Sequence, residues 1–450
     1  MVPLLLLVLH TALGLVLNST PILSTLHALC ALMVGVFMII RTPVPQGIIV
    51  IVAYITGSEV LWRMTDAHVF WEYGKYATGT ILLLTMVRHR LVRLPVLPTV
   101  YFFLLIPSMI FPLQQLPFEQ ARQQISFNLS GPFSLAVAVW FFSQVRLSVS
   151  DLLKAMEAAL LPLVSIAVLA LYTTLTAEQL TFTTESNVIT SGGFGPNQVS
   201  AVLGLGAFLA FVYIMLDGRY RLQAQSLMVV FLAQAALTFS RTGVYLAACS
   251  IAAVVVFAWR TRGPRQRAFL SLTAAGLVAA LVLYPALDAF TGGALTARFT
   301  DTNPTGRDKI LQADISIWWN HFLFGVGPGM AKPYRAEYFR AASAHTEFSR
   351  LLAEHGVLGV LAFLSLMVLG LHAFLSARGP VARAVVSGLL AWALLFQLVS
   401  AMRLVAPSVV LGLACSPLFR QTRQGLGSLV QSTFHESRRK HLRVDGTAGR

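Results

Sequence analysis

Residues 197–216 read NQVSAVLGLGAFLAFVYIML, an apolar stretch without a charged side chain. At 1.5 Å per helical residue, about 20 such residues cross a hydrocarbon core about 30 Å thick. Similar stretches recur along the whole 450-residue chain, in which 56% of residues are hydrophobic and 11% are charged. Soluble globular proteins have about 25% charged residues. The sequence therefore predicts an all-α polytopic membrane protein and excludes an ordinary soluble enzyme.

Apolar ranges bounded by Pro, Gly, Asn or charged residues predict twelve to fourteen transmembrane helices, because the shortest ranges are marginal for a crossing. The ranges are 2–17, 21–40, 47–62, 76–88, 95–112, 131–145, 155–175, 197–216, 223–239, 243–259, 268–287, 357–376, 384–400 and 404–418. We therefore expect transmembrane helices over 1–287, a helical loop carrying the site over 288–355, C-terminal transmembrane helices over 356–419 and a basic cytoplasmic tail over 420–450.

Basic residues set the expected orientation. The chain has 33 Lys and Arg against 18 Asp and Glu, a net charge of +15. Of the 33, 21 fall in alternate gaps and the tail, and five fall in the opposite short gaps. By the positive-inside rule both termini face the cytoplasm and the 288–355 loop lies outside. This distribution explains the charge by topology, so nucleic-acid binding is not expected.

The cysteines Cys30, Cys249 and Cys415 all lie in apolar ranges without metal-ligand or disulfide spacing. We also find no Walker loop and no paired-acid site for a nucleotide sugar. The sequence predicts neither a metal site nor a cofactor.

The 288–355 loop contains its own helical signals. Thr305-Gly-Arg-Asp308 fits a capping box, and the run to Phe322 has the three-and-four spacing of an amphipathic helix. Gly325-Val-Gly-Pro-Gly329 follows this helix instead of linking a strand to a helix, so we interpret it as a tight turn and not as a nucleotide-binding loop.

A second helix is expected from Tyr334 through His355. Glu347, Arg350 and Glu354 are spaced three and four apart on it, which is typical of a solvated ion-pair ladder. His345 precedes this ladder. Its imidazole suits a general base near neutral pH, although a single helical histidine is also often structural.

Two arginines are candidate anion ligands. Arg241 lies in the short turn Ser240-Arg-Thr-Gly243 between two apolar ranges, on the side with few basic residues. Its side chain can either snorkel to water or bind an oxyanion with its planar fork of donors. Arg307 follows the predicted N-cap, where a cation opposes the helix dipole and an anionic ligand would explain its presence.

Four segments together resemble the O-antigen ligase and polysaccharide polymerase family of bacterial envelope enzymes. They are Gly192-Gly-Phe-Gly-Pro-Asn-Gln198, Ser240-Arg-Thr-Gly243, Thr305-Gly-Arg307 with its aromatic helix and the glycine run 325–329, and Ala344-His-Thr-Glu-Phe348 through Glu354-His-Gly356. The resemblance covers about residues 190–375. It departs from the family where Thr346 follows His345, a position at which the family commonly has Asn.

The resemblance implies a metal-independent, GT-C-like multi-spanning glycosyltransferase of the inner membrane with a periplasmic site. Its donor would be a glycan on undecaprenyl pyrophosphate, and its acceptor a hydroxyl of the lipid A core for a ligase or of another repeat unit for a polymerase. His345 would be the catalytic base, and Arg241 and Arg307 would bind the pyrophosphate. Arg122, Asn197 and Lys309 are possible substrate contacts, and Asn197 could equally satisfy a helix end.

Two other classes of protein remain open on the sequence. A lipid or polysaccharide transporter would also have a dozen helices and a basic cytoplasmic face, although paired broken helices are not evident here. A structural membrane scaffold would need neither Arg241 nor His345.

Overall fold

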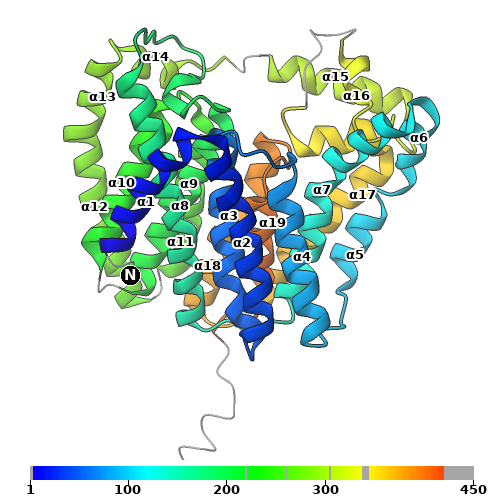
Figure 1. Ribbon diagram of the computed structural model, residues 1–450, viewed down its shortest axis with the longest axis horizontal. Coiled ribbons are helices and arrows are strands. Elements are labelled where there is room, and N and C mark those ends of the chain that lie inside the picture. The colour runs from blue at the N-terminus through cyan, green and yellow to red at the C-terminus, as the bar shows by residue number, and fades with distance from the viewer. Residues whose placement is uncertain (1–3, 218–219, 260, 304–305, 337–343, 420–450) are drawn as a thin grey trace, which may run out of the picture.

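The computed structural model describes residues 4–217, 220–259, 261–303, 306–336 and 344–419, and this part of the chain is helical without a β-strand (Figure 1). The helices of the first half are α1 (Leu4–Ser19), α2 (Pro21–Arg41), α3 (Ile49–Met64), α4 (Tyr73–Arg88), α5 (Val96–Phe103), α6 (Ile110–Gln115), α7 (Phe118–Phe142), α8 (Val149–Thr176) and α9 (Pro196–Leu216). Those of the second half are α10 (Arg221–Leu237), α11 (Arg241–Ala258), α12 (Arg262–Val278), α13 (Tyr284–Phe290), α14 (Ala294–Thr300), α15 (Arg307–Asn320), α16 (Ala331–Arg335), α17 (Glu347–Ser376), α18 (Pro380–Val399) and α19 (Ala406–Cys415).

Each predicted apolar range falls on a helix or on a string of consecutive helices, which confirms the all-α polytopic fold class. In the described residues, 10 helical segments are long and apolar enough to cross a membrane. Helices α1, α4, α10 and α19 are shorter, with 16, 16, 17 and 10 residues. The predicted twelve to fourteen spans exceed the ten because that prediction counted these short helices.

The 288–355 segment departs from its prediction at two helix starts. Helix α15 begins at Arg307 after Gly306, which has a positive φ of 78° and no side-chain cap. Thr305, the expected cap, lies outside the described residues. The expected continuous helix from Tyr334 to His355 is wrong, since α16 ends at Arg335 and residues 344–346 are not helical. Helix α17 begins only at Glu347.

Short helices gather at one end of the bundle. Helices α6, α14, α15 and α16 lie there, opposite the end at which α4 connects to α5 (Figure 1). The same end holds the start of α17, so the segments that carried the sequence motifs meet on one side of the helical bundle.

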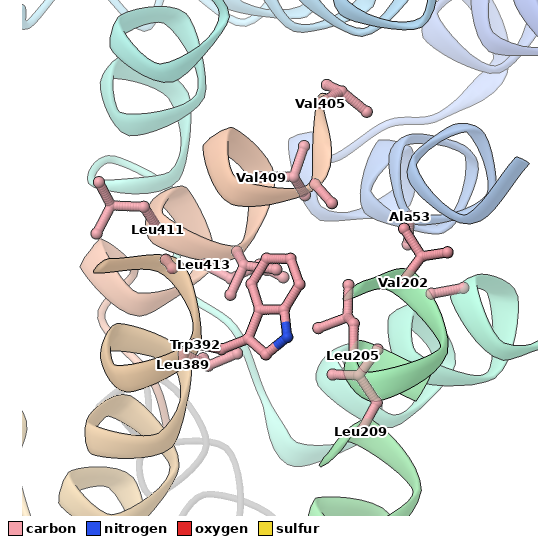
Figure 2. Close-up of a cluster of buried hydrophobic side chains, with 14 of the residues drawn as sticks. Ala53, Val202, Leu205, Leu209, Leu389, Trp392, Val405, Val409, Leu411 and Leu413 are labelled. Carbon is pink, nitrogen blue, oxygen red and sulfur yellow. The ribbon is translucent and has the colours of Figure 1, made fainter. Parts of the chain in front are cut away.

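The hydrophobic core lies where α3, α9, α18 and α19 meet (Figure 2). Trp392 of α18 is fully buried there, with Leu205 and Leu209 of α9 nearby and Val409 and Leu413 of α19 above it (Figure 2). These helices are therefore fixed against one another beneath the site end.

Helices α9 and α11 approach closely because their contact is made by small residues. A Cβ on Gly243 would lie 1.8 Å from the backbone oxygen of Ser200, and one on Gly204 would lie 2.2 Å from the oxygen of Gly243. The Ser200 hydroxyl accepts from the Gly243 amide at 3.1 Å and donates to the Ser240 carbonyl at 2.8 Å. Small residues let helix backbones approach in membranes, and here they fix the first turn of α11, which begins at Arg241.

Helix α17 is interrupted at Gly356, whose φ of 60° and ψ of −139° are not helical. A Cβ there would lie 2.5 Å from the Phe322 carbonyl oxygen, which accepts a hydrogen bond from the Val357 amide at 2.8 Å. The break separates residues 347–355, at the site end, from the apolar remainder of the helix.

We predict that Gly243→Ala lowers the stability of the protein by about 1–3 kcal/mol, because the added methyl group overpacks the α9–α11 contact. Gly276→Ala on α12 is the matched control, since a Cβ at this position meets no atom within 4 Å. Thermal unfolding in detergent should show a lower midpoint for the first variant alone. Equal midpoints for both variants would contradict this view of the helix contact.

Candidate active site

The turn between α10 and α11 holds Arg241 at the edge of the bundle. The Ser240 hydroxyl donates to the Asn197 side-chain oxygen at 2.6 Å, which ties this turn to the start of α9. Asn197, a predicted substrate contact, thus joins two helices that position Arg241. Its predicted contact with substrate stays a prediction.

Arg241 binds the segment that follows α14. Its guanidinium donates to the backbone carbonyl of Asp301 and, at 3.2 Å, to that of Asn303. Arg298 of α14 makes the reciprocal contact with the turn before α11, because its guanidinium donates to the carbonyl of Phe239 at 2.8 Å. It also donates to the carbonyl of Thr184 at 2.7 Å. These hydrogen bonds hold the loop after α14 against the turn before α11.

Arg241, Arg298 and Arg307 line one cavity of about 280 Å³. No described residue in its lining carries a carboxylate. Burial, followed by the positive charge of Arg241, lowers the pKa values of Arg298 and Arg307. Since arginine keeps its proton at neutral pH, three cations share this space, and an anion would relieve their repulsion.

The rest of this cavity runs along two helices. Its apolar lining comes from Leu246 and Tyr245 of α11 and from Leu395 and Val399 of α18. Both helices are candidate membrane spans. The cavity therefore combines a cationic end with an apolar side.

His345 lies just before α17, in the non-helical segment 344–346. Thr346 caps the helix, since its hydroxyl accepts from the Ser349 amide at 3.0 Å. Burial lowers the pKa of His345 below its ordinary value, and the charges of Arg307, Arg403 and Arg335 lower it further. The imidazole is consequently neutral at neutral pH, the form that accepts a proton.

The structure places two of the three principal predicted residues, Arg241 and Arg307, on one cavity, and His345 does not line it. The charge of Arg241 acts on Arg307, and the charge of Arg307 acts on His345. Arg122 and Lys309 are both exposed and do not line the cavity of Arg241. Arg122 pairs with Glu119 at 2.8 Å and lines a different, larger cavity, and Lys309 lies on α15 two residues after Arg307.

The Glu347–Arg350–Glu354 ladder is buried, so its predicted exposure to solvent is wrong. Arg350 donates to Glu347 through Nε at 3.0 Å and to Glu354 through Nη1 at 2.7 Å, and the three side chains are at most 5% exposed. The amide of Met402 also donates to Glu347 at 3.0 Å. The ion pairs have the expected spacing. They are shielded from solvent, however, and the 400–405 linker between α18 and α19, which is distant in the sequence, contacts them through Met402.

The glycine run after α15 forms a close turn, as predicted. Gly325, Gly327 and Gly329 all have positive φ, and a Cβ on Gly325 would lie 2.4 Å from the backbone of Glu354. The Val326 amide donates to the Ala353 carbonyl at 3.0 Å. The turn thus packs its backbone directly on the first turns of α17.

Sequence reasoning missed three charged residues near the site. Arg335 of α16 pairs with Asp314 of α15 at 2.5 Å, and both are buried. Arg403 donates to the carbonyl of Ala344, next to His345, at 3.4 Å. Arg403 could have been found from the sequence, because like Arg241 it is one of the five basic residues in the short gaps on the side with few basic residues. The Arg335–Asp314 pair carried no such signal, since its members lie on two consecutive helices that are joined by a turn.

Residues 226–364 match the family model described as O-antigen ligase, which confirms the resemblance found in the sequence. The matched segment contains Arg241, Arg307 and His345, whereas Arg122 and Asn197 precede it. A search of curated proteins found no match.

We predict that Arg350→Met lowers stability by about 3–5 kcal/mol, because it leaves two buried carboxylates without the cation that they share. Arg122→Met is the matched control: it removes an exposed pair with Glu119, which contributes about 0–1 kcal/mol. Detergent unfolding curves of the two variants measure the difference. A loss of stability at Arg350 as small as that at Arg122 would contradict the buried ladder.

Proposed function

We propose that this protein is a metal-independent, inverting glycosyltransferase of the bacterial inner membrane that transfers a glycan from undecaprenyl pyrophosphate to a sugar hydroxyl. The family match supports activity of the O-antigen ligase or polymerase type. The observation that carries the proposal is the cavity in which Arg241, Arg298 and Arg307 meet without a lining carboxylate, with the charge of Arg307 acting on a neutral His345.

The cationic end of this cavity suits a pyrophosphate. Arg241 and Arg307 bind its oxygens through planar, charged donors, and the N-terminus of α15 adds the positive end of a helix dipole. The apolar side formed by Leu395 and Val399 suits the polyprenyl chain. A lipid-linked donor uses both parts of the cavity, whereas a soluble nucleotide sugar would leave the apolar side empty.

The reaction follows from these positions. His345 removes the proton of the acceptor hydroxyl, whose oxygen forms a bond to the anomeric carbon. The bond from that carbon to the pyrophosphate oxygen breaks, and its electron pair leaves with undecaprenyl pyrophosphate. Arg241 and Arg307 stabilise the negative charge that develops, which contributes several kcal/mol where water is scarce. In-line displacement inverts the anomeric centre, and the proton on His345 passes to water.

We place the site on the periplasmic side and both termini in the cytoplasm, because 21 of the 33 basic residues fall in the gaps and the tail assigned to the inside. Among acceptors, we propose the lipid A core ahead of another repeat unit. Purified protein given a lipid-linked glycan and lipid A core should attach the glycan to the core. Long polymer on the carrier, with none on the core, would instead support the polymerase.

We predict that His345→Ala lowers the transfer rate by about 10²–10⁴-fold, the usual contribution of a general base, while binding of undecaprenyl pyrophosphate is retained. His372→Ala is the control, because His372 lies near the C-terminal end of α17 and hydrogen-bonds only weakly to Ser376 at 3.5 Å. Transfer kinetics and carrier binding measure the two effects. A transporter or a scaffold would tolerate both substitutions.

We predict that Arg403→Met moves the acidic limb of the pH–rate profile to higher pH. The charge of Arg403 helps to lower the pKa of His345, so its removal raises that pKa and protonates the base at a higher pH. Arg403→Lys keeps the charge and should keep the limb near its wild-type position. An identical shift in both variants would show that Arg403 acts by geometry alone.

A further inference from the structure

A second cavity, of about 890 Å³, lies beside the segment that carries His345. Its wall includes Ala344, the residue before His345. The Ala344 carbonyl accepts a hydrogen bond from Arg403. No described residue lines both this cavity and that of Arg241. The two cavities are therefore separate spaces, and the larger one reaches the residue next to the candidate base.

One wall of the larger cavity, on α4, α7 and the segment before α4, carries uncharged polar and aromatic groups beside the charged Glu72 and Arg122. Tyr76 of α4 hydrogen-bonds to Ser126 of α7 at 2.9 Å, and Phe70 packs on Tyr76 with ring centroids 5.7 Å apart. The α7 face adds the amides of Gln123, Gln124 and Asn128 and the ring of Phe127. Amides that both donate and accept, set beside flat aromatic surfaces, match the hydroxyls and apolar faces of sugar rings.

The glycine run contributes backbone to this wall where no side chain fits. A Cβ on Gly329 would lie 2.1 Å from the side-chain oxygen of Gln124 and 2.7 Å from the side-chain nitrogen of Asn128. A side chain at this position would therefore displace the two amides. Gly329 also has a positive φ of 77°, a backbone conformation that favours glycine over any other residue.

The facing wall contains a buried donor without a partner. Arg335 is 2% exposed. Its Nε donates a hydrogen bond to Asp314, and its Nη2 has no hydrogen-bond partner. A buried polar group normally has a partner, and leaving it unpaired is costly. Arg335 lines the cavity, so a ligand toward which this guanidinium turns would supply the missing acceptor.

The volume also fits an extended polar ligand, since binding pockets range from about 300 to 1,000 Å³. In-line displacement needs the nucleophile on the side of the anomeric carbon away from the leaving pyrophosphate. With the pyrophosphate beside Arg241 and Arg307, the acceptor approaches His345 from elsewhere, and the larger cavity supplies that approach.

We propose that this cavity is the acceptor chamber, which binds the oligosaccharide whose hydroxyl attacks the donor. Its sugars pack on Phe70 and Tyr76, hydrogen-bond to the amides of Gln124 and Asn128, and receive a hydrogen bond from Nη2 of Arg335. This assignment rests on the proposed glycosyl transfer and adds where the second substrate binds.

Cysteine protection tests the assignment without requiring catalysis. In full-length protein with Cys30, Cys249 and Cys415 replaced by Ser, Asn128→Cys is labelled with a water-soluble charged thiol reagent. Gln120→Cys is the matched control, because it is exposed on the same helix and does not line the cavity. The probes are core oligosaccharide freed of its lipid and, separately, the free oligosaccharide of the donor repeat, each at saturating concentration.

We expect the core oligosaccharide to slow labelling at position 128 at least fivefold and to leave position 120 unchanged. Unchanged labelling at 128, equal slowing at both positions, or protection by the donor repeat alone would overturn the binding of the core acceptor in this chamber. Protection by the donor repeat alone would assign the chamber to the repeat unit, which is the donor glycan of a ligase and also the acceptor of a polymerase.

Kinetics separate this proposal from the proposed function. Gln124→Ala and Asn128→Ala should each raise the KM for the acceptor about tenfold and leave the KM for the lipid-linked donor unchanged, while Gln120→Ala should change neither. Wild-type transfer with no change of acceptor KM in these variants would overturn the chamber alone. Absence of any transfer by wild-type protein, with protection at position 128 intact, would overturn the proposed function alone.

Discussion

The buried ion pairs of Arg350 hold together the parts from which the site is built. Removing three charges from water is favourable only if every one is well paired, and Glu347 and Glu354 provide this pairing within α17. Glu347 also accepts from the Met402 amide, so the linker before α19 is drawn onto the start of α17. The position of His345, two residues before Glu347, depends on this assembly.

Arginine serves two opposite purposes within this one end of the molecule. Arg350 and Arg335 are paired with carboxylates, Arg350 within α17 and Arg335 across the contact between α16 and α15. Arg241 and Arg298 instead donate to backbone carbonyls, which orient a guanidinium without cancelling its charge. The cavity that they share with Arg307 thereby keeps a positive potential, which is the property that an anionic leaving group requires.

The sequence was sufficient for the helical membrane fold, because the length of an apolar stretch is a local property. It also identified Arg241 as unusual, since a basic residue in a short gap on the side with few basic residues is notable by its position alone. The burial of Arg350 could not be predicted from the sequence, because a spacing of three and four residues is the same on a solvated helix and on a buried one. The covering linker, near Met402, is about 50 residues away in the chain. The pairing of Arg335 with Asp314 likewise depends on how two helices meet, which no local pattern encodes.

The break at Gly356 divides the long helix into two parts with different neighbours. Residues on the site side are held by ion pairs and by the glycine turn, whereas those beyond the break bury a face among the other helices, as at Ala362 and Leu366. The Val357 amide, which follows the break, donates to the Phe322 carbonyl. The direction in which the chain leaves the imidazole is therefore set by the segment after α15 and need not match the direction of the span that follows.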